Sequence, residues 1–199
     1  MHDTTTALSQ VNRMTKLGNY LALMRISQWS KAIFVMLGVF YSVSSGYFFP
    51  AVLASIAFCL ISSAVYIYND IQDRSADNLH PIKRVRPLAS GRVTLTEAVI
   101  LLFILLFTGL LLGALISKKL AFILMIYLVI NIAYNHLLKL IPVADVTCIA
   151  FGFMLRVLAG TIGIGLPISI WLTITATILS FFIALNKRQL EIHLGSKVP

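Results

Sequence analysis

Long uncharged stretches alternate with short polar segments along most of the chain. Stretches without Asp, Glu, Lys or Arg cover residues 32–69, 98–116, 120–135 and 157–186. A helix that crosses a bilayer needs about 20 mostly apolar residues. Gly and Pro in "SGYFFP" (45–50) and "GIGLP" (163–167) divide the longest runs. The pattern therefore predicts an all-α, multi-pass transmembrane helix bundle. Its six expected spans cover residues 32–48, 51–69, 97–117, 119–137, 143–163 and 168–186.

The segment before the first span has a different pattern. Within residues 8–31, Leu17, Leu21 and Met24 share one helical face, and Arg and Lys lie on the other. This arrangement predicts a helix on the membrane surface. The expected organisation is a cytoplasmic tail with an interfacial helix, a helical bundle with one large polar loop, and a second cytoplasmic tail. These parts cover residues 1–31, 32–187 with the loop at 69–96, and 188–199.

Composition and charge agree with a membrane protein. The chain is 59% hydrophobic, whereas soluble domains are typically about 45–50% apolar. The net charge of +9 does not indicate a nucleic-acid partner, because basic residues in a membrane protein first report topology. Thirteen of the sixteen Lys and Arg fall on one side of the six-span arrangement; Lys118 and Lys119 fall on the other, and Arg156 lies inside a span. The positive-inside rule predicts that both termini are cytoplasmic, in the cell (inner) membrane.

Three carboxylates gather just after the second expected span. Asp70, Asp73 and Asp77 are spaced i, i+3 and i+7, so they share one stripe of a helix that extends this span. Carboxylates on one face repel each other unless a cation lies among them. Mg²⁺ prefers a few carboxylates together with substrate phosphate oxygens, and Asn69 adds an amide. The alternative is a solvated loop that pairs its acids with its own bases.

Basic residues follow the acids directly. Lys83, Arg84 and Arg86 lie in "HPIKRVRPLASGR" (80–92), and an Arg fork suits phosphate oxygens. Positive-inside anchoring also explains part of this charge. The next segment, "TLTE" (94–97), predicts a capping box with Thr94 as N-cap and Glu97 reaching back.

The acidic segment resembles a known motif. "NDIQDRSAD" (69–77) is similar to the N-D-x-x-D-x-x-x-D motif of the UbiA-type intramembrane prenyltransferase superfamily. Other patches resemble one branch of it, the decaprenyl-phosphate phosphoribosyltransferases. These patches are "SQWSK" (27–31), "LHPIKRVRPLASGRV" (79–93), "YNHLLK" (134–139) with "ADV" (144–146), "GFMLRVLAG" (152–160) and "ALNKRQLE" (184–191).

The resemblance implies an activity for the chain. The branch transfers 5-phosphoribosyl from phosphoribosyl diphosphate to a polyprenyl (decaprenyl-like) phosphate, with Mg²⁺ as cofactor. The expected partners are therefore these two substrates and the lipid bilayer, and a homo-oligomer is compatible with this organisation. The loop at 69–96 becomes the expected catalytic loop.

The resemblance also implies roles for individual residues. Asp70, Asp73 and Asp77 are expected to bind the metal and to act in catalysis, with Asn69 beside them. Lys83, Arg84 and Arg86 are expected to bind phosphate groups. The remaining expected substrate-binding residues are Tyr134 and Lys139, then Lys187, Arg188 and Glu191 in the second polar loop, and finally Lys31 and Arg156.

Two other functions remain open from the sequence. The first is prenyl transfer from a prenyl diphosphate to an aromatic or lipid acceptor, because it uses the same Asp-rich motif. The second is non-catalytic: an inactive, truncated family member or a partner subunit. The superfamily usually has nine membrane helices, and the pattern in this chain predicts six.

Overall fold

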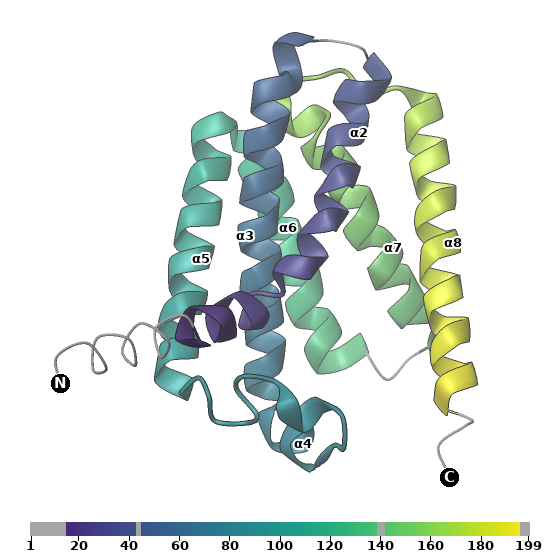
Figure 1. The fold of residues 1–199 in the computed structure, drawn as a ribbon. Helices are drawn as coiled ribbons and strands as arrows, with labels where there is room; N and C mark the ends of the chain where they lie inside the picture. Colours follow the sequence, from purple (N-terminus) through teal and green to yellow (C-terminus); the bar gives the residue numbers. More distant parts are fainter. Residues whose placement is uncertain (1–14, 43–44, 139–141, 196–199) are drawn as a thin grey trace, which may run out of the picture. The chain divides into compact units, whose positions relative to one another are not determined.

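A computed structural model describes residues 15–42, 45–138 and 142–195, without the side chains at 45, 137–138, 142–145, 187–188 and 190–195. Every regular element in these ranges is helical, so the all-α prediction is confirmed (Figure 1). Residues 15–23 form the first helical segment. The named α-helices are α2 (Ile33–Ser42), α3 (Phe48–Gln72), α4 (Arg74–Leu79), α5 (Leu95–Ile116), α6 (Lys118–Ala133), α7 (Pro142–Ala159) and α8 (Ile170–Gly195). Shorter turns are η1 (Ile26–Ala32), η2 (Ser45–Tyr47), η3 (Lys83–Val85), the π-helical η4 (Tyr134–Leu138) and η5 (Ile162–Ile164).

Four of the described helices are long and apolar enough to cross a membrane. They are Phe48–Gln72, Leu95–Ile116, Lys118–His136 and Val146–Ile164. The two remaining expected spans are shorter: the apolar helix Ile170–Asn186 falls below 18 residues, and α2 has 10 residues. Ten residues reach about 15 Å at 1.5 Å per residue, which is half of a ~30 Å hydrocarbon core.

The expected extension of the second span past Asp70 is wrong in one respect. The helix α3 ends at Gln72 and α4 begins at Arg74, so Asp73 separates them. Asp73 has φ −87° and ψ 1°, which is the bridge region between helical and extended backbone. Helical-type hydrogen bonds still run from Asp73 N–H to Asn69 C=O (2.9 Å) and from Asp77 N–H to Asp73 C=O (2.8 Å). The chain therefore bends at Asp73 without losing its backbone hydrogen bonds.

The chain divides into two compact units. The first contains Met1–Ser30 and Ser62–Phe107, and the second contains Lys31–Ile61 and Thr108–Pro199. Both α3 and α5 contribute to both units.

In the first unit, side chains tie the N-terminal helical segment to the start of α5. The capping box is confirmed: Thr94 N–H donates to Glu97 Oε2 (2.9 Å), and Glu97 N–H donates to Thr94 Oγ1 (3.2 Å). Lys16 Nζ lies 2.6 Å from Glu97 Oε1, and this hydrogen bond raises the pKa of Lys16. Residues 15–23 are helical as expected; their position on a membrane surface stays a prediction, and residues 8–14 lie outside the described part.

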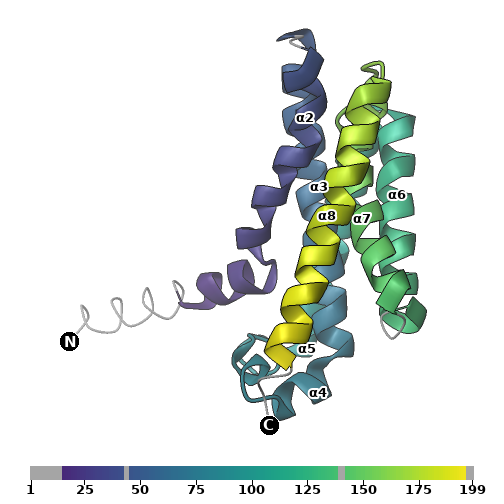
Figure 2. The same cartoon turned by 90° about the vertical axis from the view of Figure 1, so that its right-hand side faces the viewer.

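In the second unit, α7 packs against α2, α6 and α8 (Figures 1 and 2). The chain lies very close to α2 at Gly160, directly after α7, where an added Cβ would lie 1.6 Å from the Val35 carbonyl oxygen. Phe34 of α2 and Phe153 of α7 form a tilted ring pair, with ring centroids 4.7 Å apart. The small residues of "AGTIG" (159–163) thus allow the close helix packing that their spacing favours.

Candidate functional site

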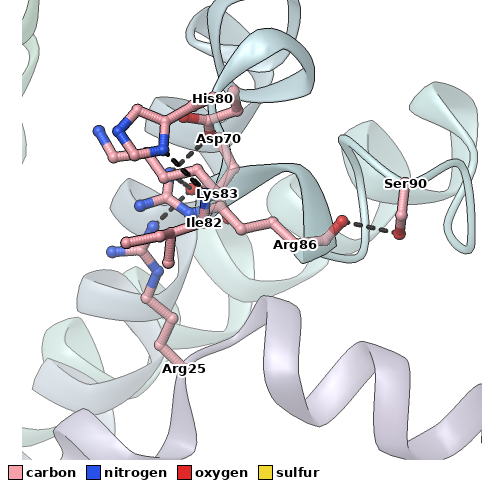
Figure 3. A network of polar contacts seen from close by, with 8 residues as sticks. Arg25, Asp70, His80, Ile82, Lys83, Arg86 and Ser90 are labelled. Carbon is pink, nitrogen blue, oxygen red and sulfur yellow. Dashed lines mark hydrogen bonds and ion pairs between the residues drawn. The ribbon is translucent and has the colours of Figure 1, made fainter.

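Two buried carboxylates and two arginines form an ionic cluster in the first unit. The side chains of Asp70 and Asp77 are only 4% exposed. Arg25 Nη2 lies 2.5 Å from Asp70 Oδ1. Arg86 Nη1 lies 3.2 Å from the same oxygen and 2.6 Å from Asp77 Oδ2. One guanidinium nitrogen is therefore shared by two carboxylates. Figure 3 shows Arg25 and Arg86 together with Asp70.

The local backbone explains how the two carboxylates meet. Asp70 lies in the last turn of α3, and Asp77 lies in the first turn of α4 with its side chain buried. Because the bend at Asp73 falls between them, both side chains reach the same nitrogen of Arg86. Asp73 itself is half-buried. Burying two anions is costly unless cations pair with them, and the two guanidiniums supply this pairing.

Arg25 also belongs to this cluster, although it is not part of the Asp-rich motif or of the basic segment that follows it. It follows the first helical segment with φ +52°, a left-handed conformation that is unusual for a residue other than Gly. Its guanidinium lies 4.9 Å from the centre of the Tyr66 ring, within the range of a cation–π contact. Its ion pair joins residues 45 positions apart, so no local spacing rule could have identified it.

The segment from His80 to Val93 carries the expected phosphate-binding bases. Nδ1 of His80 accepts hydrogen bonds from the N–H groups of Ile82 (3.2 Å) and Lys83 (3.3 Å) (Figure 3). Lys83 and Arg84 are exposed. Arg86 is 29% exposed and is engaged with the two carboxylates. Two of the three expected bases are therefore open to solvent, and the third neutralises the acids.

The donor set at the carboxylates is suitable for Mg²⁺. Among the described residues, the buried Oδ1 of Asn69 has no hydrogen-bond partner, and Asp70 and Asp77 already share one cationic group. Carboxylate and amide oxygens are the ligands that Mg²⁺ takes in proteins. Within the described ranges, no group of three or more His, Cys, Asp or Glu side chains is arranged to hold a metal ion. The site with all three carboxylates stays a prediction.

Arg156 lies in the second unit, inside α7, and is 6% exposed. Aromatic rings surround its guanidinium carbon: Phe58 at 4.9 Å, Tyr127 at 5.2 Å and Phe153 at 5.7 Å. Its Nη1 donates to the Gly152 carbonyl (2.8 Å) and its Nη2 to the Tyr127 hydroxyl (3.3 Å). These contacts stabilise the guanidinium, because burying a charged side chain within a membrane span is costly. The expected role of Arg156 in substrate binding stays a prediction.

Two other expected site residues with described side chains, Lys31 and Tyr134, also lie in the second unit. The Lys31 ammonium lies 6.0 Å from the centre of the Phe153 ring, and Tyr134 begins the π-helical turn η4, half-buried. Four other expected site residues are not covered by the described structure: Lys139 as a whole, and Lys187, Arg188 and Glu191 of α8 in their side chains. Their expected roles stay predictions.

Comparisons with known proteins agree with the motif. The chain matches the UbiA prenyltransferase family over residues 31–189. It is 32% identical over 180 residues to a decaprenyl-phosphate phosphoribosyltransferase from Mycolicibacterium smegmatis, covering 87% of this chain and 57% of the relative. The corresponding enzyme of Corynebacterium glutamicum is 33% identical over 181 residues, covering 87% of this chain and 54% of the relative.

The fold has a solved counterpart. A UbiA homolog from Archaeoglobus fulgidus, bound to GPP and Mg²⁺, superposes with a TM-score of 0.72 at 22% identity, covering 90% of this chain and 65% of that one. The chain thus spans little more than half the length of the curated relatives it matches. The apolar helices, the Asp-rich segment and these similarities lead to one conclusion: the chain is an integral membrane protein that belongs to the UbiA prenyltransferase family.

Proposed function

We propose that the chain forms the cation-binding part of a Mg²⁺-dependent transferase. The reaction moves 5-phosphoribosyl from phosphoribosyl diphosphate to a polyprenyl phosphate. The observation that carries the proposal is the pair of buried carboxylates, Asp70 and Asp77, which share one cationic group at the end of an apolar helix. Similarity to two decaprenyl-phosphate phosphoribosyltransferases over 87% of this chain supports the choice of substrates. The site then faces the cytoplasm, in the cell (inner) membrane.

The chemistry requires charge stabilisation rather than a strong protein nucleophile. An oxygen of the lipid phosphate attacks C1 of the ribose, the bond from C1 to diphosphate breaks, and diphosphate leaves with the electron pair. When bound, Mg²⁺ supplies positive charge next to the leaving diphosphate.

The chain's own residues hold and orient the charged groups. Asn69, Asp70, Asp73 and Asp77 are the residues that would hold the ion. The exposed Lys83 and Arg84 attract and orient the phosphate groups, because fixed cations bind phosphate oxygens strongly. Apolar helices beside the site suit the polyprenyl tail, whereas the sugar phosphate enters from water.

The test is a transfer assay with the purified chain in detergent. Labelled phosphoribosyl diphosphate, decaprenyl phosphate and Mg²⁺ should yield a labelled lipid and one inorganic diphosphate per product. Asp70→Asn should lower the rate about 100-fold, which is the usual effect of removing one group that stabilises developing charge. Asp3→Asn makes the same chemical change in the N-terminal segment and should leave the rate unchanged.

Two outcomes would contradict the proposal. The first is the absence of labelled lipid under conditions in which one of the longer relatives is active. The second is diphosphate release from a prenyl diphosphate with an aromatic acceptor, which would assign the chain to prenyl transfer instead.

A further inference from the structure

The ionic cluster is electrically balanced without a metal. Asp70 and Asp77 carry two negative charges, and Arg25 and Arg86 carry two positive ones. Arg86 contacts both carboxylates, and it does so through the single atom Nη1. A cation that bridges two carboxylates through one atom occupies the place that a divalent ion takes between them.

A divalent ion and Arg86 cannot both bridge the two carboxylates at the same time. Mg²⁺ binds oxygen at about 2.0–2.1 Å and requires near-octahedral geometry, so it needs the volume in which Nη1 of Arg86 lies. The ion and the guanidinium also repel each other. Binding of the ion therefore requires that Arg86 withdraws from Asp70 Oδ1 and Asp77 Oδ2.

The backbone indicates which of the two arginines moves. Arg25 is held by the Tyr66 ring and by a turn in which Arg25 N–H donates to Ala22 C=O (3.1 Å) and Gln28 N–H donates to Arg25 C=O (2.8 Å). Its described ion pair is with Asp70, and among the described residues it does not link Asp70 to Asp77. Arg86 directly follows the short turn η3, and the residues before it are exposed: Ile82 is 77% exposed and Val85 is 63% exposed. The chain becomes buried again only after Arg86, and Leu88 is fully buried.

The carboxylates also anchor this segment. The hydrogen bonds of its backbone are mostly internal: Arg84 N–H to His80 C=O (3.1 Å), Arg86 N–H to Lys83 C=O (2.9 Å) and Ser90 N–H to Arg86 C=O (2.9 Å). The Arg86 side chain adds two ion pairs to buried groups of α3 and α4. Loss of these pairs releases residues 80–86 from the acids.

We propose that Arg86 is a resident counter-ion that a divalent cation displaces. In the cation-free chain Arg86 keeps Asp70 and Asp77 neutralised and close together, and Arg25 stays as the positioning residue of Asp70. Cation entry frees Arg86, which then joins the already exposed Lys83 and Arg84 as a third base available for phosphate groups. This inference rests on the proposed function, since it assumes that a divalent cation binds these carboxylates.

The first test measures Mn²⁺ binding alone, by electron paramagnetic resonance of the free ion. Arg86→Gln should bind Mn²⁺ about tenfold more tightly than the original chain, a gain of ~1.4 kcal/mol. Such a gain follows if the site is competent only about a tenth of the time while Arg86 occupies it. Arg74→Gln removes the same charge from the exposed surface of α4 and should change the affinity less than twofold. Arg25→Gln should also have a smaller effect than Arg86→Gln.

The second test uses the original chain and hydrogen exchange. Saturating Mg²⁺ should speed exchange of the Arg84 and Arg86 amides about fivefold, because release lowers the free energy of local opening. Unchanged or slower exchange in this segment would overturn the proposal, as would Mn²⁺ affinity of Arg86→Gln equal to or below that of the original chain. If neither protein binds Mn²⁺, the metal in the proposed function fails too; binding without an Arg86 effect rejects only the displacement.

Discussion

The contact between Gly160 and α2 predicts a large loss of stability for a very small substitution. Gly160→Ala adds one methyl group, whose carbon would lie 1.6 Å from the Val35 carbonyl oxygen and 2.6 Å from the carbonyl carbon. Real Cβ atoms essentially never come within 3.0 Å of another atom. The obstacle is backbone, so no side-chain rotation relieves the clash, and α2 must move away from α7 by more than an ångström.

The cost has two parts. Overpacking in a well-packed core costs about 1–3 kcal/mol. Separation of the two helices also weakens the ring pair of Phe34 and Phe153, 4.7 Å apart at this interface, and such pairs contribute about 0.5–1.5 kcal/mol. Together these give about 3 kcal/mol. At roughly 2–4 °C per kcal/mol for chains of this size, the melting temperature should fall by on the order of 10 °C.

The assay is thermal unfolding in detergent, followed by intrinsic tryptophan fluorescence. The matched control is Gly18→Ala, because Gly18 lies in the first helical segment with nothing within 4 Å of the added Cβ. Alanine is favoured over glycine inside a helix by about 0.5–1 kcal/mol, so this variant should be as stable as the original chain or slightly more so. If Gly160→Ala has the same melting temperature as Gly18→Ala, the close packing of Gly160 against α2 is wrong.

Two further predictions concern single polar contacts. Tyr127→Phe keeps the ring beside Arg156 but removes the hydroxyl that accepts its Nη2 hydrogen bond; the chain should lose about 1 kcal/mol of stability in the same assay, and an unchanged melting temperature would show that this bond contributes nothing. In the capping box, Thr94→Ala should cost about 1 kcal/mol. Lys16→Ala removes the ion pair with Glu97 and a weaker interaction with Tyr20, so most of its smaller effect should disappear in high salt. A Lys16 effect that persists in 1 M NaCl would contradict an ionic origin.

Local sequence patterns were enough for much of the fold. Charge-free runs predicted the apolar helices, and "TLTE" predicted the capping box that begins α5, because a helix and its cap depend on residues within about four positions of each other. The bend at Asp73 was missed. The periodicity i, i+3, i+7 describes an ideal helix, and it does not show where the backbone leaves helical geometry.

The candidate site also contains contacts that local sequence patterns cannot predict. The carboxylates of Asp70 and Asp77 were identified from spacing, but their partner Arg25 was not. Arg25 is 45 positions from Asp70, and its left-handed backbone leaves no mark in the pattern of polar and apolar residues. Likewise, Arg86 was expected to bind phosphate, and the structure pairs it with the acids.

By itself, the sequence determined the helical class, the apolar segments and the grouping of acids with bases around residues 69–92, since hydrophobicity and spacing are properties of neighbouring residues. Tertiary structure alone decided which cation pairs with which anion, and that two carboxylates share one guanidinium nitrogen. The physical reason is that ion pairing of buried groups depends on distances of a few ångströms between segments far apart in the chain, and only packing sets those distances.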